Sequence, residues 1–362
     1  MADGTQVTSV VHRPHGVAPR PGSRPAPHLG IEGSPALVLQ PAVDLATGRL
    51  LGFEALLRWI VPGRGTIMPG ALIPWAEANG HMTELNTWVL AEACREAARW
   101  RSNLQVAVNC SIFQLQRGDA AAAASAALEE SGLNPDRLTV EVSETSVGDA
   151  VAAADLSAMT RLGVQLTVDD VRSDLSFLEN LQHAAVNTVK IDGALVAGLE
   201  AEGQDSSRSV VETIVDLSRS LGICTVAECV ETAGQVAILR AQRVDVAQGY
   251  FFSAPVSTDE AFALSTMEPP MTYALPDSLP DSLRAADVAT EAPAVPAAPM
   301  RSRPAPAPAA APPAPAAAAP AFEGNRVDQL AAAMALANRN LAELAAVVAK
   351  QNELLQALLP RI

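Results

Sequence analysis

The chain has 362 residues, of which 49% are hydrophobic, and it carries a formal charge of −15 at neutral pH. This is enough apolar material for one large domain or two ordinary ones, each with a hydrophobic core. Because no cluster of Lys and Arg offsets the acids, the composition argues against binding of bulk nucleic acid or of an anionic membrane through a basic face.

Residues 1–34 are rich in Pro, Gly, His and Arg without periodicity, and we expect them to form a disordered arm. They lack the apolar segment of a signal peptide, and the chain has no apolar run of 18 residues. The four cysteines form neither a CxxC pair nor a zinc-binding spacing, which is typical of reduced, buried thiols. We therefore expect a cytoplasmic protein with no membrane association.

Residues 35–265 are expected to form one domain in which apolar, β-branched runs alternate with amphipathic helices. The expected strands are ALVLQP (36–41), LLGFEA (50–55), LQVAVN (104–109), LTVEVSE (138–144), VQLTVDD (164–170), NTVKID (187–192), CTVAE (224–228) and VAQGYFF (246–252). Expected helices include residues 84–100 and 206–222. Strands that are apolar enough to be covered on both faces favour an α/β fold of the TIM (β/α) barrel type over an open sheet.

The C-terminal part of the chain has a different composition. Residues 266–325 contain an Ala/Pro-rich tract that predicts a semi-rigid linker. Residues 326–362 predict a coiled-coil helix, because apolar residues recur at heptad spacing; the seam is Val327, Leu330, Met334, Ala337, Leu341, Leu344, Val348, Gln351, Leu355 and Leu358. We expect a homo-oligomer through this helix, with docking onto the main domain or onto another protein as the alternatives.

Polar residues occur at the ends of the expected strands: Glu54, Asn109, Glu141, Asp169, Lys190, Glu228 and Gln248. The carboxyl ends of the strands of such a barrel converge on one mouth, so these side chains are expected to meet there. Glu144 and Asp170 follow closely on two of them. Any one of these residues could instead cap a helix or lie in a solvated loop, and it is the joint pattern that favours a site.

Several carboxylates within a few ångströms of one another repel, so either some of them are protonated or divalent cations bind among them. Oxygen ligands from Glu, Asp and Asn, without His or Cys, select Mg²⁺, Mn²⁺ or Ca²⁺ over zinc. A lysine among such ligands is typical of a group that orients or deprotonates a water molecule. The pattern therefore indicates a metal-dependent hydrolytic site.

An ordered series of motifs in residues 36–265 resembles the EAL-domain family of cyclic di-GMP phosphodiesterases, which is named after a tripeptide found here as Glu54-Ala55-Leu56. The motifs are LQPAVDLATGRLLGFEALLRW, VNCS, VEVSE, VDD, VKID, VAECVET and QGYFFSAP. The resemblance implies a modified TIM barrel whose first strand runs antiparallel to the others, and a role in bacterial signal transduction.

The resemblance also implies roles for individual residues. One Mg²⁺ or Mn²⁺ ion would be held by Glu54, Asn109, Glu141 and Asp169, and a second ion by Asp169 and Asp170 with support from Glu228 through water. Lys190 would orient the hydrolytic water as the base, with Gln248 close to that water. Arg58 would bind a phosphate, and Gln40 and Asp192 the guanine and ribose groups of cyclic di-GMP. Glu144 would anchor the loop after Asp170, and Glu231 would be structural.

The sequence departs from the family pattern after the aspartate pair. The family usually has D-D-F-G-T-G, whereas this chain has Asp169-Asp170-Val171-Arg172-Ser173-Asp174; Cys229 also replaces a usual glycine. Glycine permits a positive φ at low cost, so these replacements are expected to remodel the loop. Two functions follow: a phosphodiesterase that hydrolyses cyclic di-GMP to linear pGpG by a two-metal mechanism, or a degenerate module that binds cyclic di-GMP or a protein with little or no hydrolysis. Another metal-dependent hydrolase on the same barrel is a third reading.

Overall fold

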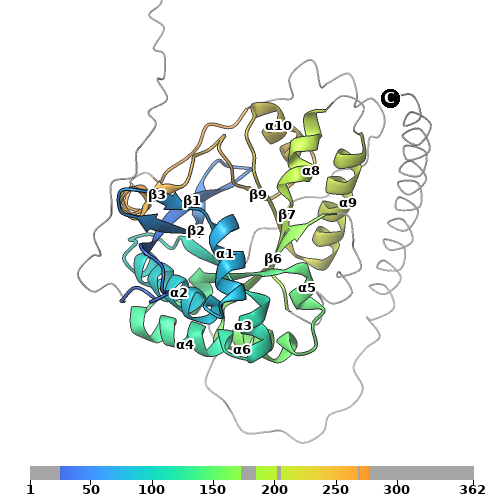
Figure 1. Ribbon diagram of the computed structural model, residues 1–362. Coiled ribbons are helices and arrows are strands. Elements are labelled where there is room, and N and C mark those ends of the chain that lie inside the picture. The colour runs from blue at the N-terminus through green and yellow to red at the C-terminus, as the bar shows by residue number, and fades with distance from the viewer. Residues whose placement is uncertain (1–24, 173–184, 202–204, 268–269, 277–362) are drawn as a thin grey trace, which may run out of the picture. The chain divides into compact units, whose positions relative to one another are not determined.

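The computed structural model describes residues 25–172, 185–201, 205–267 and 270–276 (Figure 1). Most of the predicted N-terminal arm and linker, the C-terminal helix predicted for 326–362, and Ser173 and Asp174 lie outside these residues. All of the described residues belong to a compact unit within residues 1–278.

Ten strands form a single sheet in this part of the chain; β3 and β10 are appended to it, and the other eight close into a barrel. The barrel strands are β1 (Ser34–Asp44), β2 (Leu50–Val61), β4 (Gln105–Asn109), β5 (Leu138–Ser143), β6 (Gln165–Val171), β7 (Thr188–Ile191), β8 (Cys224–Ala227) and β9 (Val246–Ala247). Strands β2 and β4–β9 pair in parallel, whereas β1 is antiparallel to both β2 and β9. The predicted modified barrel is therefore confirmed, including the reversed first strand.

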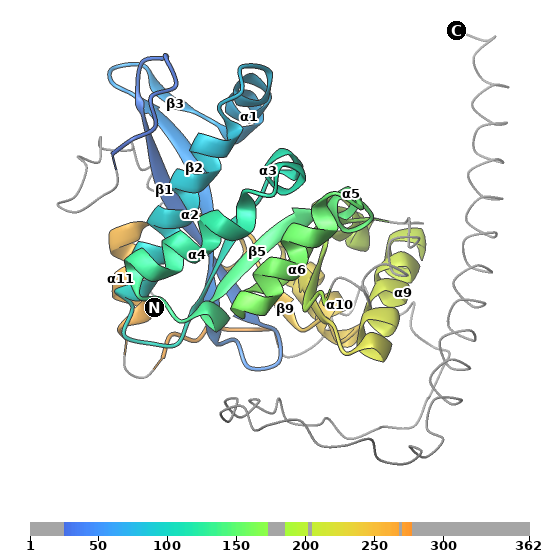
Figure 2. The same ribbon diagram turned by 90° about the horizontal axis from the view of Figure 1, so that it is seen from below.

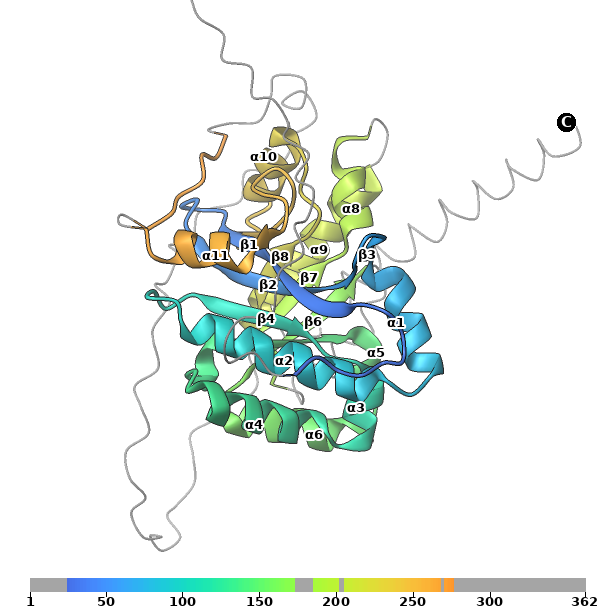
Figure 3. The same ribbon diagram turned by 60° about the vertical axis from the view of Figure 1, so that its left-hand side comes forward.

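Helices lie around the outside of the barrel (Figures 1 and 2). They are α1 (Pro69–Ala78), α2 (Met82–Ala98), α3 (Ile112–Arg117), α4 (Ala120–Ser131), α5 (Glu144–Val147), α6 (Ala152–Leu162), α8 (Gly193–Ala197), α9 (Asp205–Leu221), α10 (Ala233–Ala241) and α11 (Thr258–Ser265). Helix α2 packs against α4, and α4 against α6, while α11 packs against β1 (Figure 3). No helix among the described residues is both long and apolar enough to cross a membrane.

The periodicity of the sequence accounts for both the outer helices and the barrel strands. In α9, Val211, Ile214 and Val215 are buried while Glu212 and Asp216 are exposed, which is the pattern of a helix with one apolar face. In β5, every residue before Ser143 is buried, because one face of the strand lines the barrel interior and the other is covered by helices. The alternation of these two patterns specifies the barrel.

The first hairpin is longer than the sequence predicts. Strand β2 pairs with β4 only from Gly52 to Ala55, but it continues to Val61 and pairs there with β1 and with β3 (Gly65–Ile67). Apolar residues continue along β2 after Glu54, so the sequence pattern is compatible with the longer strand.

Packing also extends past the expected bounds of 35 and 265. Leu29 is buried, the Trp59 indole donates a hydrogen bond to the carbonyl of Glu32, and Arg49 forms a bridge to Thr272. The short strand β10 (Val256–Ser257) pairs with β1.

Candidate functional site

The strand ends meet at one end of the barrel, which we call the mouth. Glu54 lies where β2 leaves its pairing with β4, and Asn109 at the end of β4 is in register with Glu141 on β5. Asp169 lies near the end of β6, Lys190 near the end of β7, and Glu228 and Gln248 directly follow β8 and β9. The parallel strands therefore bring these residues together from most of the barrel circumference.

Lys190 is the centre of this group. Its Nζ lies 2.6 Å from Glu228 Oε1, 2.9 Å from Glu141 Oε2, 3.3 Å from Glu54 Oε2 and 3.3 Å from Asp169 Oδ1. The lysine is only 1% exposed, so its charge is removed from water and is compensated by these carboxylates. The buried cation stabilises an arrangement of acids that would otherwise repel one another.

Two amide side chains fix the orientation of Glu54. Gln248 Nε2 donates to Glu54 Oε2 at 2.6 Å and to Glu228 Oε1 at 3.1 Å. Asn109 Nδ2 donates to Glu54 Oε1 at 2.8 Å. Both oxygens of the buried Glu54 carboxylate therefore accept hydrogen bonds, which offset the desolvation cost of burying an acid in β2.

The neighbouring aspartates Asp169 and Asp170 are brought to the same side by a β-bulge. Successive residues of a strand normally point to opposite faces. Between β6 and β7 the register shifts so that Val168 pairs with Val189 but Val171 pairs with Ile191, which leaves one extra residue on β6. Asp170 has a φ of 59°, in the left-handed region.

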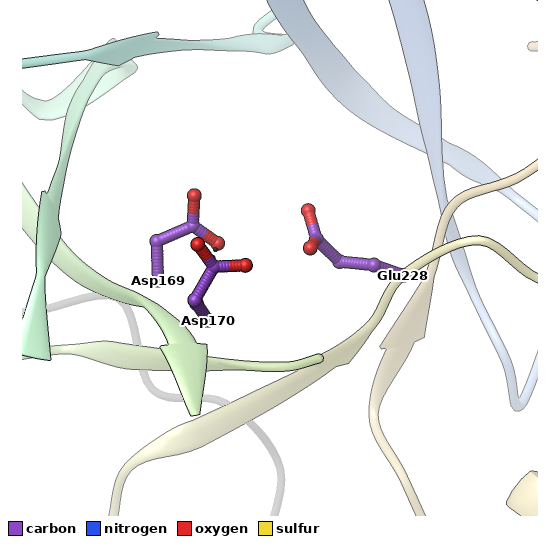
Figure 4. A group of neighbouring side chains, drawn as sticks. All are labelled: Asp169, Asp170 and Glu228. Atoms are coloured by element: carbon purple, nitrogen blue, oxygen red, sulfur yellow. Dashed lines mark hydrogen bonds between the residues drawn. The ribbon is translucent and has the colours of Figure 1, made fainter. Parts of the chain in front are cut away.

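As a result, Asp169, Asp170 and Glu228 can each direct one carboxylate oxygen to within 4.8 Å of the others (Figure 4). Figure 4 shows Glu228 facing the aspartate pair from the opposite side. We call Glu54, Glu141, Asp169, Asp170 and Glu228 the acidic cluster.

Burial, neighbouring charges and hydrogen bonds shift the pKa values of Glu54, Glu141 and Lys190 in different directions. Burial alone would raise the pKa of Glu54, but the charge of Lys190 and the hydrogen bonds from Gln248 and Asn109 bring it below its usual value. Burial and the nearby Glu54 raise the pKa of Glu141 well above its usual value. The pKa of Lys190 is raised well above its usual value, because the carboxylates outweigh the effect of burial.

The pKa values of Glu228 and Asp170 are also shifted. Burial raises the pKa of Glu228 to about 7, with Asp169 and Glu54 adding to the shift and Lys190 opposing it. Burial and the charges of Asp169 and Asp192 raise the pKa of Asp170. These acids therefore hold protons more tightly than free carboxylates, as expected where several acids converge.

The donor atoms fit a hard divalent cation. Asp169, Asp170 and Glu228 contribute carboxylate oxygens, and Glu54, Glu141 and Asn109 lie beside them. Such oxygen ligands suit Mg²⁺, Mn²⁺ or Ca²⁺. A cation among these acids would offset the burial and the mutual repulsion that raise the pKa values of Glu141, Asp170 and Glu228.

The predicted substrate-binding residues lie around the same end. Gln40 on β1 is directly opposite Glu54 on β2. Arg58 is partly buried and donates from Nη1 to the carbonyl of Leu57; burial lowers its pKa, and the charges of Tyr250 and Glu54 oppose this. Asp192 follows β7 and accepts a hydrogen bond from the backbone N–H of Ala194, so it caps α8.

The structure also describes the two remaining predicted residues, Glu144 and Glu231. Glu144 is the first residue of α5, directly after β5, and is partly buried. Glu231 is exposed, and its backbone N–H donates to Gln235 Oε1 at 2.7 Å. Its interaction with Gln235 therefore supports a structural role at the start of α10.

Sequence reasoning missed two features of the mouth. Arg172 Nε donates a hydrogen bond to Asp192 Oδ2 at 2.8 Å. The residue at the usual glycine position is thus paired with a predicted substrate-binding residue. Gly249 has a φ of 154°, and a Cβ there would overlap the backbone of Val230. The signal for Arg172 was its departure from the family pattern, and the signal for Gly249 was the QG pair after a strand.

A hollow lies beside α11. It has a volume of about 460 Å³ and is lined mainly by apolar side chains, including Phe252, Leu264, Met267 and Tyr273. Glu260 is the one charged residue in its lining, so it offers no cation to a phosphate. The mouth is therefore the better candidate for an anionic ligand.

Comparisons with known proteins agree with this architecture. A solved structure described as "PaMucR Phosphodiesterase, c-di-GMP complex" is 32% identical, has a TM-score of 0.58, and is matched over 62% of this chain and 93% of that chain. The EAL domain of Mycobacterium smegmatis DcpA is 29% identical with a TM-score of 0.53, and the match covers 64% of this chain and 97% of that one.

Among curated proteins, an uncharacterized signaling protein of Caulobacter vibrioides is 38% identical over 222 residues, which are 61% of this chain and 27% of the relative. The oxygen sensor protein DosP of Escherichia coli is 36% identical over 230 residues, covering 62% of this chain and 28% of DosP. The chain thus spans less than a third of the length of these relatives. The EAL domain matches residues 31–255, well over half of the sequence, and the chain therefore belongs to the EAL domain family.

Proposed function

We propose that the barrel mouth binds cyclic di-GMP and hydrolyses one of its phosphodiester bonds, giving linear pGpG. The observation that carries the proposal is the convergence of four carboxylates on Lys190, with Asp169, Asp170 and Glu228 close enough to share a cation. A structural neighbour at 32% identity is a phosphodiesterase in complex with c-di-GMP, which supports the choice of substrate.

Two divalent cations, Mg²⁺ or Mn²⁺, are part of this proposal. Glu54, Asn109, Glu141 and Asp169 would hold one, and Asp169, Asp170 and Glu228 the other. When bound, such ions supply charge stabilisation for the phosphate oxygens and lower the pKa of a bound water molecule. They would also offset the acidic charge that disfavours an anionic substrate.

The protein side chains orient the reacting groups. Lys190 is an ammonium in the ion-free site, because the surrounding carboxylates hold its pKa well above the usual value. It therefore donates hydrogen bonds and orients a water molecule; accepting a proton would require divalent cations to offset those carboxylates. Gln248 fixes the positions of both Glu54 and Glu228, and so sets the geometry on one side of that water.

Substrate contacts would come from the rim of the mouth. Arg58 would bind a phosphate, because a guanidinium can donate two parallel hydrogen bonds to phosphate oxygens. Gln40, opposite Glu54, and Asp192, after β7, would contact guanine and ribose groups. The partial burial of Arg58 strengthens a charge-assisted hydrogen bond at that position.

A second candidate is a module that binds cyclic di-GMP without useful turnover. The observation that favours it is the altered strand end: Val171 and Arg172 replace the family's Phe-Gly, and Arg172 is paired with Asp192. A shift of about 1 Å in a catalytic group can lower a rate on the order of a hundredfold, so ligands in place do not guarantee turnover.

The two functions are separated by one pair of measurements. The purified chain is incubated with cyclic di-GMP and Mn²⁺ or Mg²⁺, the products are separated by chromatography, and binding is measured by calorimetry. Turnover to pGpG that is abolished in Glu54→Gln and Asp170→Asn variants supports the phosphodiesterase. Binding without product supports the receptor, and the absence of both would overturn the assignment to cyclic di-GMP.

A further inference from the structure

We propose that Arg172 forms a second phosphate-binding position at the mouth, across from Arg58, so that the two guanidinium groups hold the two phosphates of one cyclic dinucleotide. The inference rests on the proposed function for the substrate, and it assigns a role to a residue that stands where the family usually has glycine.

The two arginines lie on different strands of the barrel. Arg58 lies on β2 and Arg172 directly follows β6. Around the sheet, β4 and β5 separate these strands on one side, and β7, β8, β9 and β1 on the other. The two residues therefore approach the mouth from opposite parts of its circumference.

The ligand carries two separate negative charges. A cyclic dinucleotide is a ring in which two phosphodiesters, each with one negative charge, lie on opposite sides. Lys190 cannot serve the second phosphate, because it is 1% exposed and is in contact with four carboxylates. In a chain with a formal charge of −15, a ligand with two anionic groups needs local cations on both sides.

Asp192 holds Arg172 in position. Asp192 is held by the backbone N–H of Ala194 at 2.7 Å, and its buried carboxylate accepts from Arg172 Nε at 2.8 Å. The arginine side chain remains 69% exposed, and no hydrogen bond from its Nη atoms to another described residue is present. A guanidinium has five N–H donors in one plane, so the outer edge is left to bind a phosphate with two hydrogen bonds.

Two acidic side chains beside Arg172 favour a cation at this position. Asp170 and Asp192 lie close to each other and to Arg172, and their charges affect one another. Without Arg172, Asp192 would present an unpaired carboxylate to an anionic ligand on this side of the mouth, whereas Asp170 belongs to the proposed cation site. The arginine therefore removes a repulsive contact and supplies an attractive one.

The test measures binding of cyclic di-GMP to the full chain by calorimetry, with Ca²⁺ as the divalent ion and recovery of intact nucleotide checked by chromatography. The variants are Arg172→Ala, Arg172→Gln and Arg58→Ala. The matched control is Arg161→Ala, because Arg161 is also exposed but lies in the last turn of α6, away from the strand ends. A thermal melt of each variant shows that it folds.

Loss of a charge-assisted contact to phosphate predicts a fall in affinity of about 10- to 100-fold for Arg172→Ala and for Arg172→Gln, with no change for Arg161→Ala. The bound dinucleotide should give two ³¹P resonances, of which Arg172→Ala shifts one and Arg58→Ala the other. A merely structural role for Arg172 would not select a single phosphorus atom.

The outcomes distinguish this inference from the proposed function. Absence of binding in the unmodified chain overturns both. Binding that weakens in Arg58→Ala but stays unchanged in both Arg172 variants leaves the proposed function standing and overturns the second phosphate position. Tighter binding in the Arg172 variants also overturns it, because Arg172 would then be withholding Asp192 from the ligand.

Discussion

Replacing Lys190 with methionine tests the physical basis of the site. Methionine has a similar length but no charge, so Lys190→Met leaves the packing nearly filled and removes the cation from between four carboxylates. Two of these acids, Glu54 and Glu141, are 5% and 4% exposed and would keep no counter-charge. An uncompensated buried charge is among the few changes that destabilise a protein severely.

The expected loss follows from measured cases of broken buried ion pairs, which cost about 3–5 kcal/mol. In a domain of this size, about 1 kcal/mol corresponds to a change of roughly 2–4 °C in Tm, so the variant should melt roughly 6–20 °C lower. The assay is thermal denaturation by circular dichroism at about pH 8 with a chelator present. Adding Mn²⁺ should restore part of the loss, because a bound cation replaces the missing charge.

The pH dependence of stability distinguishes the loss of the Lys190 charge from a loss of packing in the Lys190→Met variant. Without Lys190, the carboxylates of the folded state have pKa values raised above those of the unfolded chain. Stability is then lost as pH rises from about 4.5 through those raised values, so the variant should be nearly as stable as the original chain at about pH 5. An equal loss at about pH 5 and pH 8, with no effect of Mn²⁺, would refute the electrostatic argument. Arg64→Met is the control, because its ion pair with Glu32 is exposed and worth little.

Three further predictions concern other parts of the chain. Since burial raises the pKa of Glu228 to about 7, and metal binding must displace its proton, affinity for Mn²⁺ should rise about tenfold between about pH 6 and pH 8, as measured by calorimetry. Gly193→Ala should lower the Tm, because a Cβ there would lie 2.7 Å from Cys229 Sγ, and adding Cys229→Gly should restore it. Replacing Leu341 and Leu344 with glutamate should lower the mass seen in light scattering if the predicted heptad seam drives association.

Each of these predictions has a matched control. In Glu228→Gln the rise in metal affinity with pH should disappear, and its persistence would assign the proton to another acid. Gly70→Ala should leave the Tm nearly unchanged, because a Cβ there has open space, and a loss equal to that of Gly193→Ala would contradict the steric argument. Ala346 lies off the heptad seam, so the Ala346→Glu variant should keep its mass in light scattering. A lower mass for this variant, or an unchanged mass for the double leucine variant, would count against the coiled coil.

Much of the fold can be predicted from the sequence, for physical reasons. The barrel strands are apolar on both faces, and runs such as LTVEVSE and VQLTVDD lie within two residues of β5 and β6. What periodicity does not contain is strand direction. The antiparallel pairing of β1 with β2 and β9 was predicted only from the family resemblance. The end of β2 at Val61 was not predicted, because the apolar pattern of this strand has no break and its length is set by pairing with β1.

At the site, the sequence predicts which residues approach the mouth but not how they contact one another. Strand-end placement follows from topology, whereas the position of Lys190 between four carboxylates depends on side-chain packing across the barrel. The pairing of Arg172 with Asp192 likewise joins residues 20 positions apart. No local rule of sequence contains such a contact, because it forms only when neighbouring strands are assembled.

The aspartate pair shows most clearly how backbone geometry and chemistry depend on each other. In a regular strand, Asp169 and Asp170 would point to opposite faces, and only one of them could reach a shared cation. The extra residue of the bulge and the positive φ of Asp170 turn both carboxylates toward Glu228. A left-handed conformation at a residue other than glycine costs about 1–2 kcal/mol, so the surrounding strand must stabilise it. Residues after the pair therefore influence the site through the backbone of Asp170, even where their own side chains touch no ligand.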